Sequence, residues 1–161
     1  GVEKAGVNAT GLTGDGSQLT SLPSAGLSDY STFVNSTEKV TVSATAATGT
    51  INYDTNTQSV VYYTSAAVGD WTINFRASSG ATLNSVIATG EAITLVHLVT
   101  LTGAEYRNTT VQVDGSSITP EWQGGSAPTE GNINSIDSYA YTIIKTGDAA
   151  FTILAALTQF A

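Results

Sequence analysis

The side chain best suited to acid–base chemistry is His97, the single histidine of the chain. It falls on the same strand face as Leu95 and Val99 in the apolar run 92–101. Nucleophilic catalysis would need a serine or cysteine beside this base and a carboxylate to orient it, and no motif supplies them. A metal site would need companion ligands at defined spacings, which are also missing. We therefore predict a buried or half-buried histidine with one hydrogen-bond partner.

The 13 acidic residues offer little further chemistry. Several lie beside glycine or in predicted turns, where aspartate usually bonds its own backbone. A glycoside hydrolase would need two carboxylates facing each other across a cleft, and no pattern points to such a pair. The fragment 54–56 lacks most oxygen ligands of a calcium loop, and the glycine-rich run 10–20 lacks the lysine of a phosphate loop. We expect no enzymatic activity, no metal and no cofactor.

The amino-acid composition limits which classes of partner the chain can bind. The formal net charge is -8, and the five basic residues are scattered, which argues against binding to nucleic acid or to an anionic membrane. Cysteine is absent, so disulfides and thiolate metal sites are excluded. Only 11% of residues are charged, and polarity comes instead from Thr, Ser, Asn and Gly. This balance is typical of secreted or particle-bound β-proteins.

These side chains lie on segments whose sequence patterns predict β-strands. Residues 40–45 and 71–76 alternate apolar and polar side chains, as half-buried strands do, with Trp71, Ile73 and Phe75 predicted to face inward. Residues 92–101 are apolar on both faces, which suits a central strand covered on each side. Only the stretch 80–92 could hold a helical turn. The sequence therefore predicts an all-β fold, an antiparallel β-sandwich or jelly roll over residues 36–161.

Turn signals divide the predicted strands into hairpins. The pair Asp114-Gly115 is a strong turn signal, and residues 54–57 and 146–148 are also expected to join antiparallel neighbours. Aromatic side chains are spread along these strands. Exposed Tyr or Trp beside amides could stack on carbohydrate, but most are expected in the core or in subunit interfaces. Adjacent Tyr62 and Tyr63 must point to opposite sheet faces.

Residues 1–35 are predicted to form an extended connector or linker segment. This stretch is rich in Gly, Ser, Thr and Asn, and its leucines follow neither the strand nor the helix period, so it lacks the apolar surface to fold alone. A free linker rarely needs four leucines. We therefore predict that the connector packs on neighbouring subunits, with the leucines as interface residues: Leu12, Leu19, Leu22 and Leu27.

Two parts of the chain look familiar. The run LTGDGSQLTSLPSAG resembles short segments that recur in marine phage tail-fibre and other virion proteins. Residues 72–100 and 111–161 resemble the terminal domain of such cyanophage-like structural proteins, most specifically in WQGGSAP, in YTIIKT and in the QFA ending. The resemblance implies a structural component of a phage virion exterior, without catalytic residues, and commonly a homotrimer.

The resemblance leaves the place on the particle open. We expect a tail fibre or appendage at the virion surface, with other virion proteins as partners and a host-surface glycan as a receptor of the assembly. A capsid decoration or cement protein that stabilises the head is one alternative. A bacterial surface filament subunit, which would polymerise by strand donation from residues 1–35, is another.

Overall fold

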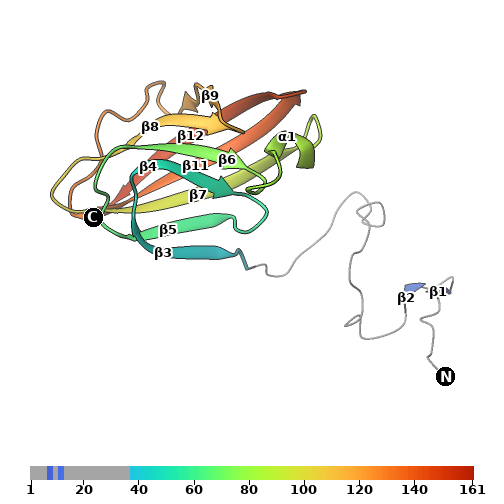
Figure 1. Ribbon diagram of the computed structural model, residues 1–161, viewed down its shortest axis with the longest axis horizontal. Coiled ribbons are helices and arrows are strands. Elements are labelled where there is room, and N and C mark those ends of the chain that lie inside the picture. Colours follow the sequence, from blue (N-terminus) through green and yellow to red (C-terminus); the bar gives the residue numbers. More distant parts are fainter. Residues whose placement is uncertain (1–6, 9–10, 13–36) are drawn as a thin grey trace. The chain divides into compact units, whose positions relative to one another are not determined.

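The computed structural model describes residues 7–8, 11–12 and 37–161 (Figure 1). The chain divides into two units, Gly1–Ser36 and Thr37–Ala161. In the first unit, β1 (Val7–Asn8) and β2 (Gly11–Leu12) pair antiparallel. The side chain of Leu12, and all of Leu19, Leu22 and Leu27, lie outside the described residues, so their predicted interface role stays a prediction.

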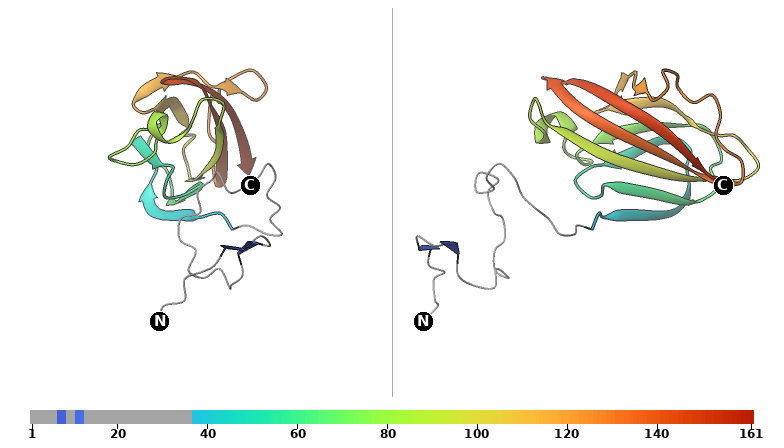
Figure 2. Two further views of the ribbon diagram at one scale, coloured as in Figure 1. Left: turned by 90° about the vertical axis from the view of Figure 1, so that its right-hand side faces the viewer. Right: turned by 180° about the vertical axis from the view of Figure 1, so that it is seen from behind.

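The second unit is an all-β domain with two stacked sheets (Figures 1 and 2). The large sheet has six strands in the spatial order β10 (Glu121–Trp122), β12 (Ala150–Phe160), β11 (Ser135–Gly147), β7 (Ala92–Leu101), β5 (Val60–Ser65) and β3 (Val40–Ala46). The small sheet has four, in the order β4 (Gly49–Asp54), β6 (Trp71–Arg76), β8 (Asn108–Val113) and β9 (Ser116–Ile118). The domain is sandwich-like, and this arrangement does not establish a jelly roll.

The strand directions differ from the antiparallel expectation. From β3 to β8 the chain passes from one sheet to the other with every strand, so that β3, β5 and β7 run parallel in the large sheet. In the same way, β4, β6 and β8 run parallel in the small sheet. The prediction of a hairpin at residues 54–57 is therefore wrong, because this turn carries the chain from β4 in one sheet to β5 in the other.

Two other predicted turns do form hairpins. β8 and β9 pair antiparallel across Asp114 and Gly115, whose φ angles of 51° and 83° explain the choice of these two residue types. β11 and β12 pair antiparallel along almost their whole length, and Gly147 lies opposite Ala150 beside the turn. The predicted helical turn is α1 (Leu83–Val86), a single turn on which Leu83 is buried.

The core lies between the two sheets, where alternate residues of each strand meet. Trp71, Ile73 and Phe75 are each at most 1% exposed, as their alternation predicts. On β7, which does lie between β5 and β11, only the inner side chains are buried, and the outer ones are half-buried or exposed. The expectation that both faces of this strand are covered is therefore wrong, because within residues 37–161 no third layer packs on the large sheet (Figure 2).

Candidate functional site

The outer face of the large sheet, meaning the side chains that point away from the small sheet, carries no charge on five of its strands. Apart from tyrosines, only three ionisable side chains lie on β3, β5, β7, β11 and β12, namely His97, Asp137 and Lys145. All three point inward and are at most 7% exposed. The outward positions hold Thr, Ser and the following apolar residues: Val40, Val42, Val60, Tyr62, Val96, Leu98, Ile136, Ala140, Ile144, Leu154, Ala156 and Phe160.

The register places these apolar side chains in rows across the sheet. One row runs Val40, Val60, Val96, Ala140 and Ala156 over five neighbouring strands. At the edges of the face the side chains are well exposed, for example Val42 at 66% and Phe160 at 56%. In the middle they are half-buried because they cover one another. Contiguous exposed apolar surface of this kind is a common feature of interaction sites in proteins.

The outer face of the small sheet is the opposite in character. Its outward positions on β4, β6, β8 and β9 are all polar: Thr50, Asn52, Asp54, Thr72, Asn74, Arg76, Thr110, Gln112 and Ser117. Side chains alternate between the two faces of every strand in both sheets, so strand geometry does not explain this difference. The two outer faces of the domain therefore differ in polarity, with the apolar side chains gathered on the large sheet.

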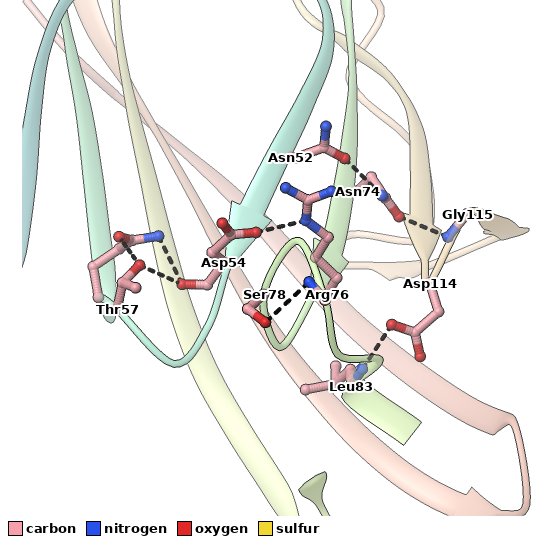
Figure 3. Close-up of polar contacts among 11 residues, drawn as sticks. Asn52, Asp54, Thr57, Asn74, Arg76, Ser78, Leu83, Asp114 and Gly115 are labelled. Atoms are coloured by element: carbon pink, nitrogen blue, oxygen red, sulfur yellow. Dashed lines mark hydrogen bonds and ion pairs between the residues drawn. The ribbon is translucent and has the colours of Figure 1, made fainter. Parts of the chain in front are cut away.

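A polar cluster ties the strand ends of the small sheet together (Figure 3). Asn74 Nδ2 donates to Asn52 Oδ1 at 2.8 Å, and Asn74 Oδ1 accepts from the backbone N–H of Gly115 at 2.8 Å. Arg76 Nε contacts Asp54 Oδ1 at 2.6 Å in a pair that is about 30% exposed, so the pair contributes little net stability. These contacts hold three strands in register, and their donors and acceptors are engaged with one another.

Asp114 extends this cluster to α1. One of its carboxylate oxygens accepts from the backbone N–H of Leu83 at 2.7 Å (Figure 3), and the other accepts from the backbone N–H of Asn84 at 2.9 Å. Lys145 also holds α1 in place, because its Nζ donates to the carbonyl oxygens of Asn84 and Ile87. The cluster therefore supports the fold at this end of the domain and leaves no organised acid–base pair.

Replacing Asp114 with Ala is expected to lower the free energy of unfolding by roughly 2–4 kcal/mol, since it removes two charge-assisted hydrogen bonds and places Ala at a positive φ. Asp114→Asn should cost less than half as much, because Asn tolerates this backbone conformation and keeps one acceptor. Urea unfolding of the two variants measures the difference. Equal stability of Asp114→Ala and the parent chain would contradict the role given to this carboxylate.

His97 lies in an aromatic box inside the domain. It is 0% exposed, and its ring meets Trp71 edge to face at 5.7 Å and Tyr63 at 5.4 Å. Neither ring nitrogen has a hydrogen-bond partner among the described residues. The prediction of burial is confirmed, and the predicted hydrogen-bond partner is not found. Burial lowers the pKa of His97 from 6.5 to about 3, so the ring is a neutral packing element without access to solvent.

A pocket of about 690 Å³ opens beside Trp122 and the end of β12. We call it the Trp122 pocket. Its floor contains Trp122 and Leu157, which are half-buried, and its walls carry Gln123, Gln159 and other polar side chains. No sequence motif could reveal it, because its lining comes from residue 105, from the loop 123–133 and from the end of β12.

Chemistry of other kinds is not organised in the described part of the chain. No group of three His, Cys, Asp or Glu side chains there could hold a metal ion. No helix among the described residues is long and apolar enough to cross a membrane. Glu105 and Glu130, both exposed, do share the Trp122 pocket, which sequence spacing did not indicate.

Searches of protein-family models, of curated protein sequences and of solved structures found no match.

Proposed function

We propose that this chain is a structural subunit of a phage virion exterior, a tail fibre or appendage, whose copies assemble through the outer face of the large sheet. The observation that carries the proposal is the absence of charge from five of the six strands of that face, with Glu121 on the edge strand β10 as the exception, although the chain has a net charge of -8. Two copies can meet there without burying an unpaired charge, which would cost several kcal/mol. The resemblance of residues 12–26 and 111–161 to virion proteins supports the location.

The area of the face approaches that of an assembly contact. Five strands about 4.8 Å apart, over about seven residues of about 3.3 Å each, present roughly 550 Å² before side-chain relief is counted. A specific interface buries about 600–1,000 Å² on each partner. The occupant is a further copy of this chain, because such a face is complementary to the same face of another copy, which is also apolar and is uncharged on these five strands.

The oligomer we propose is a trimer, with three outer faces turned toward a threefold axis. The polar small sheets and the acidic loops then face water, which keeps the negative charges of the copies apart. The connector of residues 1–35, with its leucines, adds contacts between neighbouring subunits. Display of three or more copies would convert weak contacts with a host surface into avidity.

The experiment is a measurement of mass in solution by light scattering, on the whole chain and on residues 37–161. A particle of three times the chain mass of 16.5 kDa is expected for the whole chain. If the connector adds to the interface, residues 37–161 should still associate. Their oligomer should, however, have a larger dissociation constant than the oligomer of the whole chain. A monomer in both forms at all concentrations would contradict the proposal, and a stable dimer would contradict the threefold arrangement.

A further inference from the structure

The Trp122 pocket has the form of a ligand site and is separate from the assembly face. In β10 the side chain of Glu121 points to the outer side of the large sheet, and that of Trp122 points to the inner side. No residue of the small-sheet strands lines the pocket, whose walls come from β10, from the end of β12 and from the loops around residues 105 and 123–133. Its volume of about 690 Å³ is within the range of roughly 300–1,000 Å³ found for small-ligand sites.

The aromatic floor of the pocket is held in place before any ligand arrives. The indole of Trp122 packs edge to face against two tyrosine rings, with ring centroids 6.4 Å from Tyr139 and 6.3 Å from Tyr141. These contacts fix its orientation. Both tyrosines are completely buried. The part of the indole that lines the pocket is therefore a rigid apolar plate, and a ligand binding on it does not have to order it.

The wall of the pocket is anchored as well. Gly131 N–H donates to the carbonyl oxygen of Glu105 at 3.0 Å, and a Cβ at this glycine would lie only 2.3 Å from the carbonyl oxygen of Tyr106. The loop must therefore keep glycine here to lie so close to the neighbouring segment. On the other side, the backbone N–H of Gln123 donates to Ala155 at 2.7 Å. The polar side chains of the pocket thus project from fixed backbone.

The lining selects among ligand classes. No Lys or Arg lines the pocket, and Glu105 and Glu130 do, which disfavours phosphates, sulfates and acidic sugars. The amides of Gln123 and Gln159 each offer both a donor and an acceptor, as neighbouring hydroxyl groups require. A ligand that fits has one apolar face for the indole and hydroxyls around its edge, and carries no negative charge.

We infer that the Trp122 pocket binds a neutral sugar ring, stacked on the indole of Trp122 with its hydroxyls bonded to Gln123, Gln159 and the pocket carboxylates. This site lies within one chain and does not depend on the assembly proposed above. It gives the domain a means of recognising glycan that repeats once per subunit. Asp137 supports the site from behind, since its buried carboxylate accepts from the backbone N–H of Asn132 at 3.2 Å and interacts with Gln159.

The test uses the intrinsic fluorescence of the whole chain with maltotriose, mannotriose and galactotriose as neutral probes and trigalacturonate as the acidic probe. Trp71 is 1% exposed and Trp122 is half-buried, so an emission change on adding sugar reports on Trp122. We expect at least one neutral probe to bind with a dissociation constant of about 1 mM or below, and trigalacturonate to bind at least tenfold more weakly. The absence of any neutral-probe binding by fluorescence and by calorimetry overturns the inference.

Variants locate the binding. Trp122→Ala should weaken it at least tenfold, as read by calorimetry, because the plate is lost. Since this change also removes contacts with the core, Gln123→Ala is the second variant: its side chain is exposed, and we expect a threefold or larger loss without loss of stability. Gln112→Ala, on the outer face of the small sheet, is the matched control and should bind like the parent. Unchanged binding in Gln123→Ala and Trp122→Ala would overturn the placement of the site.

Discussion

Replacing His97 with Phe is expected to remove most of the acid sensitivity of this domain. Burial lowers the pKa of His97 from 6.5 to about 3, so the unfolded chain binds a proton on this ring in a pH range where the folded chain does not. Stability is therefore lost as pH falls below 6.5, and the loss continues until about pH 3. The contribution of this one group amounts to roughly 3 kcal/mol by pH 4.

The measurement is urea unfolding of the parent chain and of His97→Phe at pH 7, 5 and 4, at one protein concentration. Phe fits the surroundings, because Trp71 and Tyr63 contact the ring through aromatic edges and faces, and neither nitrogen has a partner to lose. We expect similar stability at pH 7 and a widening advantage of the variant as pH falls. Parallel curves for the two proteins would contradict a buried neutral His97.

Asp137 acts in the opposite direction, which is why the comparison is made between variants. Burial raises the pKa of its carboxyl above 3.8, so the folded chain holds this proton more tightly than the unfolded chain. Its stabilising contribution is complete below pH 3.8 and is lost as pH rises through the raised folded value. Both proteins share this effect, and the difference between their curves isolates His97.

The second large effect is expected at the outer face of the large sheet. Val96 lies on β7, in the apolar row between Val60 and Ala140, and is half-buried in the single chain. Val96→Glu leaves the monomer folded, since the new carboxylate reaches water there, but each interface would have to bury it unpaired. A penalty of about 3–5 kcal/mol at each contact should raise the dissociation constant at least a hundredfold.

Gln112→Glu is the matched control for Val96→Glu. It introduces the same charge in the middle of a strand, but on the polar outer face of the small sheet, beside Asn74 and Ser117. We expect the control to keep the oligomeric mass of the parent and Val96→Glu to run as a monomer with an unchanged circular dichroism spectrum. Association of Val96→Glu as strong as that of the control would count against the proposed interface.

Local patterns predicted the strands better than their connections. The alternation at Trp71, Ile73 and Phe75 marks the inward face because side chains alternate in any strand. The same period of two occurs in parallel and antiparallel sheets, so it could not reveal that β3 to β8 change sheet at every step. The turn signal at residues 54–57 was equally ambiguous, whereas Asp114-Gly115 specified a hairpin because both residues adopt positive φ.

The outer face of the large sheet and the Trp122 pocket also differ in how far the sequence could reveal them. The uncharged outer face is visible in the sequence once the inward parity is known, because Asp137 and Lys145 both share the parity of the buried Tyr139. The Trp122 pocket could not be foreseen, since its walls come from the end of β12 and from the loops around residues 105 and 123–133. The leucines predicted as interface residues lie outside the described residues or side chains, and their role remains a prediction.

The absence of cysteine allows a direct test of the assembly face. Ala140→Cys places one thiol in the middle of the outer face of the large sheet, and Thr72→Cys places one on the small sheet at a similarly half-buried position. The rate of maleimide labelling of each native protein is the measurement. The proposed assembly predicts that the thiol at residue 140 is protected until denaturant is added, while the thiol at residue 72 reacts freely. Equal labelling rates at the two positions would contradict burial of this face between subunits.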